Sequence, residues 1–270
     1  MLDNRILIKN ARQVERSRGL FYVFLLLVNS FFILGCNSEN ASDCFQNSGD
    51  IVRVEVDVAA FTTITVFENL NVVVKQGTTQ KIEIETGEFL LNDISAIVEG
   101  SRLILRNENS CNYVRDYGLT TIYLTAPNIS EIRSSTGGLI SSDGVLNYSD
   151  ISLLSESFSQ PETETTDGSF NLELDSENIS ILTNGIAFFK LQGSVENIDI
   201  FIAAGDSRIE ADSLIAENVG LNHRGSNDIF VNPQQRISGT IRGYGDVISS
   251  NRPPEIEVEE LFNGRLLFRD

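Results

Sequence analysis

Two short sequence patterns recur in the second half of the chain with a common period near 20 residues. In the first pattern a glycine lies at the centre of a turn, and successive glycines are 20 residues apart. In the second pattern an asparagine stands between a glutamate and a branched aliphatic residue, at steps of 19 and 21 residues. The glycine copies are Ala204-Gly205-Asp206, Arg224-Gly225-Ser226 and Tyr244-Gly245-Asp246, and the asparagine copies are Glu177-Asn178-Ile179, Glu196-Asn197-Ile198 and Glu217-Asn218-Val219. Weaker copies of the second pattern occur at Pro127-Asn128-Ile129 and Ser149-Asp150-Ile151. A period of this size predicts a solenoid, in which each coil buries its apolar side only by stacking on its neighbours.

The segments between these patterns are short and rich in β-branched residues, which favours strands over helices. We therefore expect an all-β fold, a right-handed parallel β-solenoid (β-helix) with coils about 4.8 Å apart. The glycines would form corners that need a positive φ. The asparagines would stack as a ladder that satisfies amides facing inward. A β-sandwich in which the spacing is coincidental is the alternative.

The two ends of the predicted solenoid differ from its middle. Alternating or β-branched segments at 52–58, 64–66, 72–74, 81–85, 102–106 and 120–125 predict N-terminal strands, with a short helical turn at 89–93. At the other end, Asn251-Arg252-Pro253-Pro254 interrupts the strand pattern. We expect residues 255–260 and 266–268 to form a charged hairpin that caps the last coil.

The N-terminal region resembles a bacterial lipoprotein signal peptide with its lipobox. Basic residues between Arg5 and Arg18 precede an apolar run of about 15 residues that ends in Leu34-Gly35-Cys36. On this interpretation residues 1–35 are removed, Cys36 is the site of lipid attachment, residues 36–50 are a flexible tether, and residues 51–270 form one domain. The expected location is the cell envelope, with the lipid in the outer membrane. An uncleaved anchor or a chance cysteine is the alternative.

The assignment of Cys36 to a lipid leaves two cysteines, Cys44 and Cys111. An even remainder in an oxidising compartment predicts a disulfide. Closing this 67-residue loop would stabilise the fold by roughly 4 kcal/mol through the unfolded chain. Two free thiols are the alternative.

The formal charge of the chain is −18, and it constrains the partners. Residues 1–35 contain five basic and two acidic residues, so the remainder carries −21. Such a surface excludes nucleic acid, whose phosphates require Lys and Arg. It also opposes electrostatic docking on anionic lipid, so that membrane attachment would rest on the acyl chains.

The composition also limits catalysis and metal binding. A single histidine, His223, excludes histidine triads and multi-histidine metal sites, and we expect it to be a surface turn residue. Asp206 and Asp246 should point the same way two coils apart with Ser226 between them, but Ca²⁺ needs six to eight converging oxygens. A solvated acidic face is therefore favoured over a Ca²⁺ site. We expect no catalytic residue, no metal and no cofactor.

Three segments resemble the head GIN domain family of auto-transporter adhesins. They are Phe61-x-x-Ile64-x-Val66, Val74-Lys75-Gln76-Gly77, and the run from Ile122 through Ala126-Pro127-Asn128-Ile129 to Ile132. The similarity extends over roughly residues 50–250, including the glycine-marked coils. It implies a β-solenoid on exported, often lipid-anchored proteins of Bacteroidetes. The family brings no established activity and therefore no functional residues.

The sequence thus predicts a lipid-anchored envelope protein that is not an enzyme and whose solenoid surface serves adhesion or binds a glycan or protein partner. The alternative is a carbohydrate-active enzyme, similar to a polysaccharide lyase, on the same scaffold. That chemistry needs a carboxylate cluster holding Ca²⁺ beside an Arg or Lys base. Arg224, Arg242 and Lys190 could supply the base, but the sequence does not distinguish among them.

Overall fold

The chain folds into 17 strands and two short 3₁₀ helices, as seen in a computed structural model that describes residues 43–109, 111–113, 118–159 and 162–269. The all-β prediction is confirmed, and so is the short helical turn near residue 91. The elements are η1 (Asp43–Phe45), β1 (Ile51–Val56), β2 (Thr63–Phe67), β3 (Asn71–Gln76), β4 (Lys81–Gly87), η2 (Leu91–Asp93), β5 (Ile94–Glu99), β6 (Arg102–Asn107), β7 (Thr121–Ala126), β8 (Glu131–Ser135), β9 (Leu139–Leu146), β10 (Asp150–Ser155), β11 (Ser169–Thr183), β12 (Phe188–Ile202), β13 (Arg208–His223), β14 (Ile229–Ile241), β15 (Val247–Ser249), β16 (Glu255–Glu260) and β17 (Leu266–Phe268).

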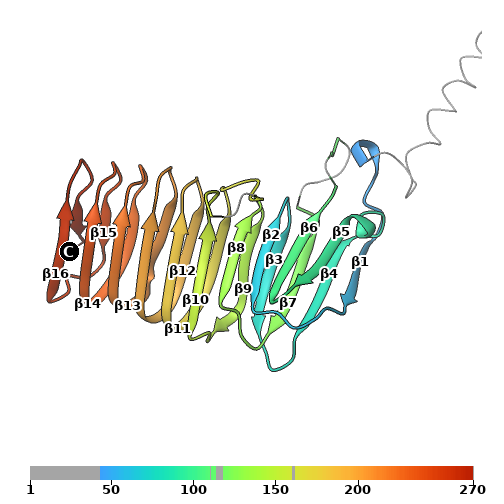
Figure 1. Ribbon diagram of the computed structural model, residues 1–270, viewed down its shortest axis with the longest axis horizontal. Coiled ribbons are helices and arrows are strands. Elements are labelled where there is room, and N and C mark those ends of the chain that lie inside the picture. Colours follow the sequence, from blue (N-terminus) through green and yellow to red (C-terminus); the bar gives the residue numbers. More distant parts are fainter. Residues whose placement is uncertain (1–42, 110, 114–117, 160–161, 270) are drawn as a thin grey trace, which may run out of the picture.

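The long strands β11 to β14 each contribute to two layers of the molecule. The first part of β11 pairs with β9, and its second part pairs with β10. The first layer runs β1-β4-β7-β3-β9 and continues through the first parts of β11 to β14 to β15 and β17. The second layer runs β5-β6-β2-β8-β10 and continues through the second parts of β11 to β14 to β16. Figure 1 shows the result as a rod, with the C-terminus at one end and β1 at the other.

Parallel pairing connects the coils, but the sheet as a whole is mixed. Adjacent coils stack in register, for example Asn178 against Asn197 and Asn197 against Asn218. The N-terminal end instead contains the antiparallel pairs β1–β4, β4–β7 and β5–β6. Between β5 and β6 only Gly100 and Ser101 remain, and so short a connection permits only an antiparallel hairpin. The right-handed winding of the coils stays a prediction.

The apolar core is one continuous column of stacked side chains. Every second residue of the second layer points inward, so Ile179, Ile198, Val219 and Ile237 lie one above another in successive coils. Burying each such side chain contributes about 1.5–3 kcal/mol. In the first layer the rings of Phe170 and Phe189 stack with centroids 4.7 Å apart. The core is therefore built by repetition, as the period predicts.

The repeat glycines lie at the corner where the second layer turns into the first, but a positive φ explains only one of them. Gly205 has a φ of +87°. Gly245 has no positive φ, and a Cβ at this position would lie 1.9 Å from the carbonyl oxygen of Asn227 in the preceding coil. Close stacking of the turns, rather than backbone handedness, therefore selects glycine there.

The expectation of a C-terminal capping hairpin is wrong. β16 pairs in parallel with β14, and β17 pairs in parallel with β15, so this segment forms one further coil. The reason is that the strand register of the coils continues: Ile256 pairs with Ile237, and Val258 packs partly buried against the core. Glu260 pairs with Ile241 but is exposed at this open end of the rod, where its carboxylate accepts a hydrogen bond from the backbone N–H of Leu266 at 2.8 Å.

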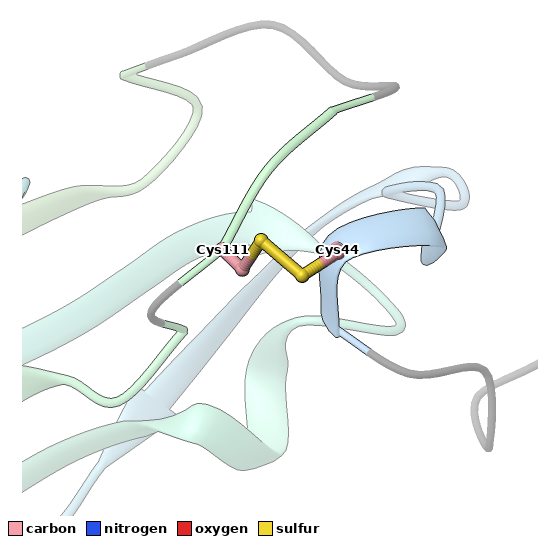
Figure 2. Close-up of a disulfide and its surroundings, with 2 residues drawn as sticks. All are labelled: Cys44 and Cys111. Atoms are coloured by element: carbon pink, nitrogen blue, oxygen red, sulfur yellow. A yellow bond between two sulfur atoms is a disulfide. The ribbon is translucent and has the colours of Figure 1, made fainter.

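The N-terminal end of the rod carries a disulfide between Cys44 and Cys111, as the cysteine count predicts (Figure 2). It joins η1 to the segment that follows β6. Gln46 is buried and donates a hydrogen bond to the carbonyl oxygen of Phe89 at 3.0 Å. The last residues of the expected tether thus pack on the folded end, while Cys36 and the predicted signal lie outside the described residues. No helix in the described part of the chain is long and apolar enough to span a bilayer.

Candidate ligand-binding groove

The asparagine ladder predicted from the repeat is present at the start of the second-layer strands. Asn218 donates from Nδ2 to Oδ1 of Asn197, and Asn197 donates in the same way to Asn178, both at 3.0 Å. Asn178 extends the row by donating to the carboxylate of Asp150 at 2.7 Å. The expectation that these amides face inward is wrong, because the next residue in each strand, such as Ile198, faces the core. Alternation therefore places the amides on the outer surface.

A groove of about 540 Å³ lies directly over this ladder. It is lined by Asn178, Asn197, Ile198, Asp199, Asn218, Val219, Gly220, Arg236 and Ser238. Gly220 occupies an outward position of β13, between Asp199 in one neighbouring coil and Ser238 in the other. The missing side chain leaves room that the flexible carboxylate of Asp199 enters, with its Oδ1 2.2 Å from where a Cβ at position 220 would be. Glycine inside a strand often marks a place where a ligand approaches the backbone.

The groove presents hydrogen-bonding groups and little apolar surface. Each ladder amide donates one of its two N–H groups to its neighbour, and the second N–H remains available as a donor. The carboxylate of Asp199 has no hydrogen bond or ion pair with any group in the described residues, so its acceptors face the groove. Arg236 contributes a guanidinium that also contacts Glu257. The groove therefore offers both donors and acceptors, which is the chemistry that recognises hydroxyl groups.

With this geometry in view, we compared the chain with known proteins. Residues 60–253 match the family model described as "Putative auto-transporter adhesin, head GIN domain". The chain belongs to this family. The resemblance inferred from the sequence is therefore confirmed, and the ladder and groove lie within the matched head GIN domain.

Solved structures share the fold of this head GIN domain. A "putative adhesin" from Bacteroides fragilis is 18% identical with a TM-score of 0.72, over 83% of this chain and 99% of that one. A "putative lipid binding protein" from Parabacteroides distasonis is 15% identical with a TM-score of 0.57, over 82% and 98%. A "putative adhesin" from Parabacteroides merdae is 16% identical with a TM-score of 0.57, over 82% and 97%. Among curated proteins, none matches this chain.

The acidic corner residues of the head GIN domain do not converge. Ser226 donates to the carboxylate of Asp206 at 2.8 Å, whereas Asp246 accepts from the backbone N–H of Arg265 at 2.8 Å. Within the described ranges, no group of three His, Cys, Asp or Glu side chains is placed to hold a metal ion. The carboxylates are engaged separately, so the arrangement gives the Ca²⁺ alternative no support.

His223 is fully buried, so its expected place on the surface is wrong. It ends β13 in the inward series Val219, Leu221, His223. Its Nδ1 accepts a hydrogen bond from the backbone N–H of Gly225 at 3.3 Å. Burial lowers the pKa of this imidazole, although the neighbouring backbone of Gly245 and Asn227 and the carboxylates of Asp228 and Asp246 act in the opposite direction. Continuing the alternation of inward residues in β13 from Leu221 to the next inward position predicts that His223 is buried.

The three basic residues considered for a lyase lie on different parts of the head GIN fold. Lys190 is on the outer surface of the first layer in β12, whereas Arg224 and Arg242 follow the second-layer strands at the corner. The described residues bring no carboxylate cluster with metal-binding geometry to any of them. The described residues therefore do not bring together the carboxylate cluster and the base that a polysaccharide lyase needs.

Sequence reasoning missed most of the groove. Asp199, Arg236 and Ser238 carry no mark that separates them from other outward polar residues. Gly220 did carry a signal, because it interrupts the outward polar series Asn218, Gly220, Asn222 in the middle of a strand.

Proposed function

We propose that this head GIN protein is exported, anchored in the cell envelope through a lipid on Cys36, and binds an extended glycan along the groove over the asparagine ladder. The observation that carries the proposal is the open groove at Gly220, where one coil omits the outward side chain that its neighbours supply. Membership of an adhesin family and a likeness to "putative adhesin" structures support a binding role at the surface.

An extended polymer suits the groove better than a compact ligand. Coils repeat about every 4.8 Å along the rod, so each step offers a new set of polar groups to a chain lying parallel to the axis. The lining combines amide, carboxylate, hydroxyl and guanidinium groups from four coils. One structural neighbour is named for lipid binding, but this polar lining does not suit an acyl chain.

The attachment is inferred from three features. Residues 1–35 have the layout of a signal peptide, Cys36 follows a small residue, and the disulfide between Cys44 and Cys111 suits an oxidising compartment. Labelling of cells with an alkyne fatty acid should tag the protein, and C36S should abolish the tag and release the protein from the membrane fraction. Equal labelling of wild type and C36S would contradict the anchor.

Glycan binding can be tested by filling the groove. Wild-type protein is first screened on a glycan array, and the affinity for the strongest hit is then measured by calorimetry for wild type, G220V and S213V. Valine suits a strand, and at position 220 it must displace only the flexible carboxylate of Asp199. Ser213 is an exposed residue of the same strand on the first layer, so S213V is the matched control.

We expect G220V to lose at least tenfold in affinity, while S213V binds as wild type and both keep the thermal stability of wild type. Unchanged affinity in G220V would refute the groove. An array without any hit would refute glycan binding.

A further inference from the structure

Two arginines stand side by side at the corner where the second layer turns into the first. Arg224 follows the last residue of β13, and Arg242 follows the last residue of β14. His223 pairs with Ile241, and the backbone N–H of Arg242 donates to the carbonyl oxygen of His223 at 2.7 Å. Arg224 and Arg242 are therefore in register on adjacent coils, about 4.8 Å apart along the rod. Both side chains are exposed.

These two arginines differ from every other arginine in the described part of the chain, because neither has an ion pair or an aromatic ring as a partner. The others with a carboxylate partner are Arg53, Arg102, Arg106, Arg133, Arg208, Arg236 and Arg265. Arg252 and Arg269 lie over aromatic rings. An unpaired pair of like charges is notable in a chain of formal charge −18, where carboxylates outnumber basic groups by almost two to one. Two adjacent guanidiniums repel each other until an anion joins them.

The carboxylates at this corner have other partners. Asp206 accepts from the hydroxyl of Ser226, and Asp228 accepts from the backbone N–H of Asp246 at 3.0 Å. Asp246 in turn accepts from the backbone of Arg265. The corner thus retains free guanidinium donors next to hydroxyl and carboxylate groups that are already held in place.

Two exposed aromatic rings lie beyond Arg242, on the side of the arginine pair that faces the last coil. Tyr244 lies two residues after Arg242 and is 66% exposed, and Phe262 in the next coil is 48% exposed. Their ring centroids are 5.0 Å apart in an edge-to-face arrangement. Adjacent exposed aromatic rings are a common sign of a recognition surface, because they offer large rigid contact area at low entropic cost.

We propose that this corner, formed by Arg224, Arg242, Tyr244 and Phe262, binds an acidic saccharide. The paired guanidiniums bind the carboxylate of the acidic sugar through charge-assisted hydrogen bonds, and the aromatic rings pack against the apolar face of the sugar ring. The hydroxyl of Ser226, two residues after Arg224, donates to Asp206, and its oxygen can still accept from a sugar hydroxyl. The negative charge of the whole molecule disfavours polyanions and anionic membranes, so the ligand is a saccharide with isolated carboxylates.

The corner is distinct from the groove over the asparagine ladder. The groove residues nearest the corner are Gly220 and Ser238, and each lies four residues, or about 13 Å, before Arg224 or Arg242 along its strand. The inference therefore does not rest on glycan binding in the groove, and each site is tested by its own variants.

The test compares two probes that differ by one acidic sugar, sialyllactose and lactose, in calorimetric or NMR titrations of the purified protein. We expect sialyllactose to bind at least tenfold more tightly than lactose. The double variant R224Q/R242Q should lose at least about tenfold in affinity for sialyllactose, since a hydrogen bond to a charged group contributes about that factor. Raising the salt concentration from about 0.05 M to 0.5 M should weaken binding to the wild type.

K190Q is the control, because Lys190 is an exposed cation on the other layer and lies outside both candidate sites. It should bind sialyllactose as wild type, and thermal melts should show that all variants fold. Equal affinity for the two probes, or full binding by R224Q/R242Q, would overturn the assignment. Absence of binding to sialyllactose would overturn it as well.

Discussion

The guanidinium of Arg133 in β8 donates a hydrogen bond to the carboxylate of Glu156, which directly follows β10, and the two side chains are only 5% and 0% exposed. The other carboxylate oxygen of Glu156 accepts the backbone N–H groups of Phe158 and Ser159, both at 2.9 Å. Burial alone would raise the pKa of Glu156, but the hydrogen bonds from Ser159 and Arg133 outweigh it and the pKa is lowered. The pair thus fixes the start of the β10–β11 connection against the outer surface of the second layer.

Removing the charge of Glu156 should lower the free energy of unfolding substantially. E156Q removes the fully buried carboxylate partner of Arg133 and leaves only the half-buried Glu131, 3.9 Å from Nε, so we expect the free energy of unfolding in urea to fall by about 3 kcal/mol. The control is D143N, which removes an equivalent charge from the exposed pair of Lys75 and Asp143, 2.6 Å apart. It should cost less than about 1 kcal/mol. Similar losses in both variants would contradict the special role of the buried pair.

The disulfide should stabilise the N-terminal end of the rod. It closes a loop with a sequence separation of 67 residues, so its loss in C44A/C111A should lower the free energy of unfolding by about 4 kcal/mol. Chemical denaturation of the variant and of the wild type measures this difference. The intact mass of the native protein should lie two hydrogens below the value for free thiols. Complete labelling of Cys44 and Cys111 by a thiol reagent in the native protein would contradict the bridge.

His223 should make the free energy of unfolding depend on pH. Its pKa in the folded state lies below the ordinary value of 6.5, so the unfolded chain binds the proton more readily. Stability should therefore be fully present above pH 6.5 and fall as the pH decreases below it, until the folded-state pKa is reached.

H223N keeps an acceptor for the N–H of Gly225 but cannot titrate near neutral pH. Thermal melts between about pH 7 and 5 should show a smaller acid-induced loss in H223N than in the wild type. Parallel pH profiles for the two proteins would show that His223 does not contribute.

Two glycines with positive φ allow the cost of close stacking to be measured. A Cβ at Gly205 (φ +87°) would lie 2.2 Å from the carbonyl oxygen of Gly185, whereas a Cβ at Gly100 (φ +65°) meets no atom within 4 Å. G100A should cost about 1–2 kcal/mol from backbone strain alone. G205A should cost a further 1–3 kcal/mol or so, because the stacked turns must separate. Equal losses in urea denaturation would show that the turns are not tightly packed.

The repeat could be interpreted from the sequence because each coil contacts the next at nearly constant separation. Asn178, Asn197 and Asn218 recur in the sequence because they touch in space. The N-terminal end offers no such signal. There β2 pairs with both β6 and β8, so the order along the stack is β6-β2-β8 and does not follow the order in the sequence. Segments of equal β propensity do not encode that order.

Two predictions, the surface position of His223 and the C-terminal hairpin, are wrong for the same reason: the strands continue further than the nearby turn and prolines indicate. The inward series of β13 ends at the fully buried His223, and in β16 Val258 packs partly buried against the core. A turn beside His223 and the proline pair before residue 255 predict instead a surface role for the histidine and a capping role for residues 255–260. The groove was out of reach for a different reason: Asp199 and Ser238 meet at Gly220 only through lateral pairing of three coils.

The position of the disulfide and the C-terminus at opposite ends of the rod has a mechanical consequence (Figure 1). A pull between these ends acts along the hydrogen bonds that join one coil to the next. Among the described residues the last coil, β16 and β17, pairs only with β14 and β15, so we expect it to detach first. Each further coil that unfolds shortens the rod by about 4.8 Å but releases 19 to 21 residues of chain, which span about 63–76 Å when extended. Under load we expect the molecule to lengthen in steps of one coil, while the end that carries the disulfide stays folded.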